Sequence, residues 1–301
     1  MLKWSQYSLI ASLVLVVLAM ACYILVLMLG RSVRQAPVMA HAGRRAAGGG
    51  TLTDVAPGPP TPSSQPHALA LYGTHFSRLA LVFVTACLVL RTIAVGHGPF
   101  SNQYEFSVAF GWGMIAAYIY FEYRYHVRTL ALVILPLTAG LLLYALNIDA
   151  AANQLVPALQ DGFLLTIHVA VAIVAYGALA VSFAAGLLYL IQPEQGRAGL
   201  PKPALLDLIG YRAVIFSFPL LTLTSVLGAI WAQKAWGSYW TWDPKETAAL
   251  FTWLVYGAYL HARVARGWVG RRSAWLLMFG FAAVLLTFFG NLFFGGLHSY
   301  A

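Results

Sequence analysis

Charged side chains are scarce in this chain: they make up 9% of its 301 residues, whereas 60% of the residues are hydrophobic. Ordinary soluble domains carry about 25% charged residues. A chain this long with a mean hydropathy of +0.75 would expose more apolar surface than water tolerates. The composition therefore excludes a water-soluble globular protein and predicts an integral membrane protein.

Cysteine is nearly absent, and the common hydrolytic motifs are absent as well. The two cysteines, Cys22 and Cys87, lie in separate apolar runs and form no C-x-x-C pair. This excludes a dithiol redox motif and a site where this chain itself would carry covalent c-type haem. The patterns G-x-S-x-G, H-E-x-x-H and the P-loop are missing from the sequence, which argues against hydrolytic chemistry.

Eight apolar segments are long enough to cross a bilayer as helices, which takes about 20 residues each. They lie near residues 8–29, 76–95, 104–122, 129–146, 163–191, 212–233, 247–264 and 274–294. The sequence thus predicts an all-α integral membrane protein with about eight transmembrane helices. Residues 1–30 hold the first helix, residues 31–74 are rich in glycine and proline and predict a flexible linker, and residues 75–301 form the main transmembrane core.

Basic residues are distributed unevenly between the two sets of connecting segments. The larger set holds Arg31, Arg34, Arg44, Arg45, Arg78, Arg124, Arg128, Arg197, Lys202, Arg212, Arg263, Arg266, Arg271 and Arg272. The other set holds only Lys3, Arg91, Lys234 and Lys245. Because Lys and Arg concentrate on the cytoplasmic side, the larger set and the linker are expected there and both termini on the outer side. Topology explains most of the positive charge. We therefore expect the chain to contact membrane lipid and not to bind nucleic acid.

An outward segment at residues 231–247 is unusually rich in tryptophan. Trp236, Trp240 and Trp242 fall within seven residues and are followed by Asp-Pro-Lys-Glu. Their broad aromatic faces would suit a flat, hydrophobic macrocycle, with Gly237 and Pro244 breaking the helix. The alternative is an ordinary aromatic belt at the membrane interface.

The pattern W-G-x-x-W-x-W-D-P-K-E at residues 236–246 resembles the WWD signature of the haem-handling proteins of cytochrome c biogenesis. Further similarity lies in Gly-Pro-Phe-Ser-Asn-Gln-Tyr-Glu at 98–105 and Gly-Leu-His-Ser-Tyr at 296–300. The resemblance is to the CcsA (ResC-type) family of System II and covers about residues 76–301. The first span and the linker match less.

The resemblance implies haem b as the bound group and histidines as ligands of its iron. His168 lies near the outer end of the fifth span and His298 follows the last span, so the charge count places both on the side of the tryptophan segment. The family's external axial ligands correspond to this pair, and neutral imidazole suits the role. The alternative is an interfacial histidine bonded to a carbonyl.

A third histidine, His261, lies about 21 Å along the seventh span from Thr247. An ionisable group within a span is a functional hypothesis by default. The resemblance implies that His261 is a ligand of a second, intramembrane haem position, with its partner ligand supplied by another protein. A snorkelling interfacial histidine is the alternative.

Four charged residues near the outer side could contact haem or fix the segment that holds it. Lys245 is the first candidate for the haem propionates and Arg91 the second, although Arg91 and Glu105 could simply neutralise each other. Asp243 is expected to cap the helix that follows it. No side chain is assigned as a catalytic acid or nucleophile.

The resemblance implies haem translocation and its attachment to apocytochrome c, as a subunit of a cytochrome c synthase. The implied partners are a CcsB/ResB-type membrane protein, an apocytochrome c with a CxxCH motif, and thiol-reducing proteins. Two alternatives stay open: a haem exporter or chaperone that serves another carrier, and a b-type cytochrome that transfers electrons. The composition favours a bacterial inner membrane over a thylakoid, with the site facing the periplasm.

Overall fold

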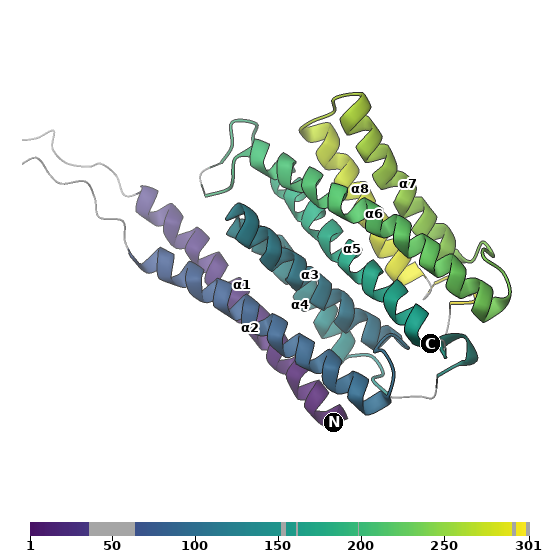
Figure 1. Cartoon of the computed structure of the whole chain (residues 1–301). Helices are drawn as coiled ribbons and strands as arrows, with labels where there is room; N and C mark the ends of the chain where they lie inside the picture. The colour runs from purple at the N-terminus through teal and green to yellow at the C-terminus, as the bar shows by residue number, and fades with distance from the viewer. Residues whose placement is uncertain (36–63, 152–154, 161, 198, 291–292, 299–301) are drawn as a thin grey trace, which may run out of the picture.

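The computed structural model describes residues 1–35, 64–151, 155–160, 162–197, 199–290 and 293–298. These residues form eight long helices and no strand (Figure 1). The helices are α1 (Leu2–Gln35), α2 (Ser64–Val95), α3 (Gln103–Tyr125), α4 (Ala131–Leu146), α5 (Gly162–Leu190), α6 (Pro203–Trp236), α7 (Pro244–Ala265) and α8 (Arg271–Phe289), with short 3-10 turns η1 (Arg128–Leu130) and η2 (Pro157–Leu159). The prediction of an all-α protein is confirmed.

Successive helices run in opposite directions, so their connections gather at two ends of the bundle (Figure 1). The tryptophan end holds the connections after α2, α4 and α6, including residues 237–243. The arginine end holds the connections after α3, α5 and α7, including Arg128, Arg197 and Arg266. Met1 and the last described residues both lie at the tryptophan end, as the alternation of eight helices requires.

Six of the long helical segments are apolar enough and long enough to cross a membrane: they begin at Leu2, Ala68, Arg128, Gly162, Pro203 and Arg271. The remaining helices, α3 and α7, have 23 and 22 residues. They are less apolar because charged residues lie near their ends, such as Glu105 and Glu122 in α3 and Arg263 in α7. Each of these charges has a partner inside the bundle: Arg91 for Glu105, Arg128 for Glu122, and Asp207 for Arg263.

The core of the bundle is built around α5. It packs against α3, α6 and α8, while α1 and α2 form a pair on one side that contacts α3 and α4 (Figure 1). The middle of α5 is buried and rich in small residues, including Ala175, Gly177 and Ala178. Small residues allow helix backbones to approach closely where lipid provides no hydrophobic driving force. This packing fixes the relative positions of α5 and α6, which carry part of the site.

Helices α1 and α2 extend further than the sequence predicts. Residues 31–74 are expected to be a linker, yet α1 continues to Gln35 and α2 begins at Ser64. A helix satisfies its own backbone hydrogen bonds and can continue beyond the hydrocarbon, and Pro66 is tolerated in the first turn of α2. Residues 36–63 lie outside the described part of the chain.

Candidate functional site

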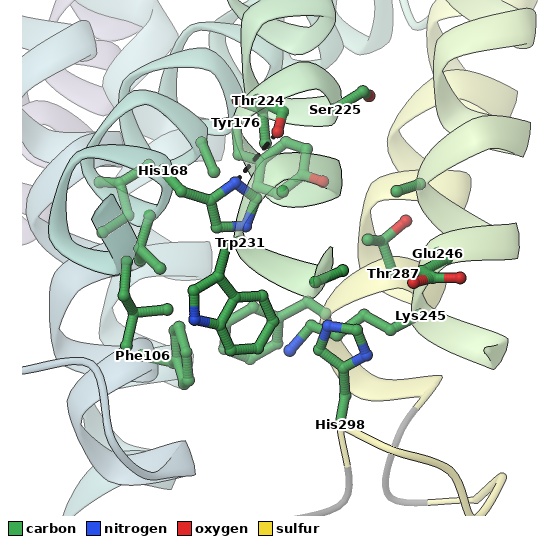
Figure 2. A pocket seen from close by; sticks show the side chains of 18 of the residues that line it. Phe106, His168, Tyr176, Thr224, Ser225, Trp231, Lys245, Glu246, Thr287 and His298 are labelled. Carbon is green, nitrogen blue, oxygen red and sulfur yellow. Dashed lines mark hydrogen bonds between the residues drawn. The ribbon is translucent and has the colours of Figure 1, made fainter. Parts of the chain in front are cut away.

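A cavity of about 160 Å³ lies at the tryptophan end between α3, α5, α6, α7 and α8 (Figure 2). His168 reaches it from α5, Lys245 from the first turn of α7, and His298 from the segment after α8. Trp240 lies on its wall. The cavity therefore joins His168 and His298, which are 130 residues apart in the sequence, as the resemblance implies.

His168 is held by α6. Its Nδ1 lies 3.0 Å from the carbonyl oxygen of Thr224, and a carbonyl only accepts, so Nδ1 carries the proton. This leaves Nε2 with its lone pair, directed toward Trp231 in Figure 2. A Cβ on Gly228 would lie 2.8 Å from the imidazole, so glycine is needed there for the ring to pack against α6.

His298 is held in the same way by a carboxylate. Its Nδ1 lies 2.8 Å from Oδ1 of Asp243, and the backbone N–H of Leu297 donates to Oδ2 of Asp243 at 2.6 Å. Burial, followed by the charge of Lys245, lowers the pKa of His298 to about 4, despite the opposing effect of Asp243. At neutral pH the imidazole is therefore neutral, and its Nδ1 carries the proton that the carboxylate of Asp243 accepts.

Asp243 also begins α7. Its side chain accepts from the backbone N–H of Lys245, and Glu246 completes a capping box, which confirms the predicted cap. Burial opposes ionisation of Asp243, but the hydrogen bonds from Lys245, His298 and Leu297 outweigh it and hold the pKa of this carboxyl below its usual value. Asp243 thus fixes the start of α7 and the orientation of His298 together.

Trp231 is a site residue to which the sequence analysis gives no role. Its ring lies 6.4 Å from that of His168, nearly parallel at 10°, and 5.8 Å from that of His298. Its Nε1 donates to the carbonyl of Ala158, and the residue is only 2% exposed. One signal could have revealed it: Thr224, Gly228 and Trp231 are spaced i, i+4, i+7, which places them on one face of α6.

The irregular part of the tryptophan segment is shorter than the outward segment predicted at residues 231–247. Helix α6 continues through Trp231 to Trp236, where Gly237 ends it at a φ of 75°, and α7 starts at Pro244. Trp236 packs edge-on against His298, with ring centroids 4.8 Å apart. Trp242 is 68% exposed and does not line the cavity. Only residues 237–243 therefore form the irregular segment.

Lys245 lies on the cavity wall, with its Nζ 4.9 Å from the ring centre of Phe106. Within the described part of the chain, its ammonium has no carboxylate within salt-bridge distance. A half-buried cation with an aromatic neighbour and no carboxylate within salt-bridge distance is suited to bind an anionic group that enters the cavity.

Arg91 and Glu105 lie outside the cavity and bind each other. Nε of Arg91 donates to Oε1 of Glu105 at 2.8 Å, and its other nitrogens donate to the carbonyls of Ala150 and Ala151. Oε2 of Glu105 accepts from the backbone and hydroxyl of Ser101. The arrangement is a structural ion pair, which ties α2, α3 and the connection after α4 together.

His261 lies apart from the other candidate histidines. It is exposed on α7, four residues before the helix ends at Ala265, and so lies toward the arginine end. The described residues place no second histidine beside it. The cavity brings together His168, His298, Lys245 and Trp240, but neither His261 nor the ion pair of Arg91 and Glu105.

The chemistry of the cavity fits a haem group, although its volume is small. Two imidazoles line it, each oriented through Nδ1, Lys245 supplies a cation, and Phe106 and Tyr176 supply aromatic walls. Small-molecule pockets usually have about 300–1,000 Å³. The cavity of about 160 Å³ must therefore widen before it can enclose a macrocycle.

The chain is similar to known proteins over most of its length. Residues 100–298 match the family model described as cytochrome C assembly protein. The cytochrome c biogenesis protein CcsA of Guillardia theta is 37% identical over 250 residues, covering 74% of this chain and 83% of the relative. The protein of the same name from Gloeobacter violaceus is 35% identical, covering 76% and 86%.

Among solved structures, the cytochrome c heme lyase CcmF superposes with a TM-score of 0.63 at 16% sequence identity. The match covers 96% of this chain and 46% of CcmF, so this chain spans less than half the length of that protein and shares its fold. Fold and cavity together define a helical integral membrane protein with a paired-histidine site. The chain belongs to the cytochrome c assembly protein family, as a CcsA-type member, and has a role in cytochrome c maturation.

Proposed function

We propose that this protein holds haem b between His168 and His298 and presents it to an apocytochrome c for covalent attachment. The observation that supports this most is the meeting of two imidazoles in one cavity, each oriented by an acceptor at Nδ1: the carbonyl of Thr224 for His168 and the carboxylate of Asp243 for His298. Haem is the cargo of this reaction. Its propionates would bind Lys245, and its hydrophobic faces would contact Trp240 and Phe106.

The residues of this chain position the reactants and supply no nucleophile. Haem supplies two vinyl groups, and each cysteine of a CxxCH motif adds its S–H across one vinyl C=C, forming a C–S bond without net oxidation. The addition needs reduced thiols, which thiol-reducing proteins provide. The histidine of the incoming motif replaces one of the two imidazoles, and His298 is suited to yield because it lies on the segment after α8 and not within a helix.

The delivery route of haem is part of the same proposal. His261 lies toward the arginine end and is exposed on the surface of α7. An exposed histidine can share a haem with a ligand from a neighbouring membrane protein, here a CcsB/ResB-type partner. With the arginine end in the cytoplasm, haem would pass His261 before reaching the cavity on the periplasmic side of a bacterial inner membrane.

The proposal is tested by expressing the chain with a CxxCH reporter, with and without the CcsB/ResB-type partner. We expect covalent haem on the reporter only when both membrane proteins are present, measured by haem staining after denaturing electrophoresis. If both proteins together load haem onto a separate carrier and never label the reporter, the exporter alternative replaces the synthase.

A further inference from the structure

A second cavity, of about 250 Å³, lies at the arginine end, away from the paired histidines. Helix α2 lines it with His75 and Arg78, α3 with Glu122, and the connection to α4 with His126 and Arg128. Charge in this chain is scarce, so two arginines, a glutamate and two histidines around one cavity are unusual. The sequence suggests only that the two histidines anchor the membrane interface.

The carboxylate of this second cavity is already satisfied. Glu122 is buried and accepts hydrogen bonds from Thr74 and, at 3.4 Å, from the hydroxyl of Tyr23. Nε of Arg128 lies 3.4 Å from the same carboxylate. These contacts tie α1, α2 and α3 together and neutralise Glu122 and Arg128 as a pair.

Arg78 remains as an unpaired cation. Within the described part of the chain, its guanidinium has no carboxylate within salt-bridge distance and makes no hydrogen bond. His126 lies beside it in the cavity lining with a φ of 54°, a conformation that histidine adopts at a cost and that neighbouring structure must hold in place. The cavity therefore presents a guanidinium and two imidazoles to whatever enters it.

The depth of the cavity matches the level of lipid head groups. The apolar part of α2 extends from Ala68 to Val95, which are 28 residues or about 42 Å of helix. The hydrocarbon core is about 30 Å thick. With Val95 at the boundary on the tryptophan side, about 12 Å of α2, counted from Ala68, projects beyond the core at the arginine end. Arg78 then lies near the boundary, while Leu79 and Val82 follow it along the helix and are exposed by 43% and 60%.

We propose that this cavity binds the phosphate group of an anionic phospholipid, with Arg78 as its main contact. Guanidinium groups bind phosphate through two parallel hydrogen bonds, and basic pockets between transmembrane helices bind lipid head groups. The exposed apolar surface at Leu79 and Val82 continues from the cavity and accommodates acyl chains. This surface favours a lipid over a free phosphate ion as the source of the phosphate.

The test compares two arginines at the same end of the full-length protein. Arg78→Gln removes the contact, whereas Arg124→Gln removes an exposed arginine that does not line the cavity and lies over the ring of Tyr125. Binding of phosphatidylglycerol is measured by native mass spectrometry, with phosphatidylcholine as the neutral lipid. We expect Arg78→Gln to weaken phosphatidylglycerol binding about tenfold and Arg124→Gln to leave it unchanged.

Two outcomes overturn the proposal. Equal losses in both variants would mean that diffuse surface charge attracts the lipid, and displacement of phosphatidylglycerol by inorganic phosphate at a similar concentration would make the site a phosphate site and not a lipid site. If Arg78→Gln does not fold, His126→Asn is used in its place, since asparagine tolerates a positive φ, and we expect a smaller loss of phosphatidylglycerol binding because Arg78, the main contact, remains. Haem loading at the other end is a separate readout, so this test does not depend on the proposed function.

Discussion

Asp243 performs three tasks with one carboxylate. It caps α7, it accepts from Nδ1 of His298, and it accepts from the backbone N–H of Leu297. A histidine ligand whose second nitrogen is bonded to a carboxylate keeps its tautomer and orientation. The aspartate of the tryptophan motif is therefore a positioning residue for the proposed ligand His298.

Replacing Asp243 by asparagine separates these tasks. Asparagine is an equally good helix cap, so the start of α7 should be kept, whereas its NH2 group cannot accept from the backbone N–H of Leu297 as Oδ2 of the carboxylate does. The carboxylate that orients His298 is lost, and we expect haem affinity to fall by about 10-fold to 100-fold. Haem titration followed by absorbance, together with thermal unfolding, measures both effects. Unchanged haem affinity in Asp243→Asn would show that the contact with His298 has no role in ligation.

The sequence predicts individual residues of the site better than their contacts. His168 and His298 can be proposed from the resemblance and the charge count, because both depend on local sequence. The bond from His168 to Thr224 and the packing of Trp231 between the histidines depend on how α5 meets α6. Likewise, Arg91 has charge suitable for a propionate, and only the fold shows that Glu105 and two carbonyls already bind it.

At the scale of helices, hydrophobic runs locate the eight elements but not their ends. Apolar residues locate the part of a helix that lies in lipid, whereas its continuation into water depends on backbone hydrogen bonds and caps. Helix α6 begins at Pro203 and ends at Trp236, well outside the apolar run at 212–233. For this reason the outward segment predicted at residues 231–247 includes the last turn of α6, which ends at Trp236.

The contact between α3 and α5 offers a test at this scale. A Cβ on Gly177 of α5 would overlap the carbonyl oxygen of Gly113 on α3, so the two backbones meet directly. We expect Gly177→Ala to force the helices apart and to lower the free energy of unfolding by about 1–3 kcal/mol. Thermal unfolding in detergent measures the change.

Gly140→Ala on α4 is the matched control. Its added Cβ has no neighbour within 4 Å, and alanine favours a helix over glycine, so stability should be unchanged or slightly higher. Equal melting temperatures for the Gly177→Ala and Gly140→Ala proteins would contradict the close packing of α3 and α5.

At the scale of the whole molecule, successive helices alternate in direction, so all connections at one end of the bundle lie on the same side of the membrane. The positive-inside rule predicts that the arginine end lies in the cytoplasm. Alkaline phosphatase, which is active only in the periplasm, should therefore be active when fused after Ala301 and inactive when fused in the connection between α5 and α6. The reverse pattern would put the paired histidines on the cytoplasmic side and contradict the proposed presentation of haem to an exported apocytochrome.

The most direct measurement of the central claim is the absorbance spectrum of haem bound to the purified full chain. We expect a spectrum of iron with two histidine ligands, its loss in both His168→Ala and His298→Ala, and its partial return with added imidazole. His97→Ala is the control, because His97 lies at the same end and does not line the cavity. A two-histidine spectrum that survives in both the His168→Ala and the His298→Ala proteins would contradict the account.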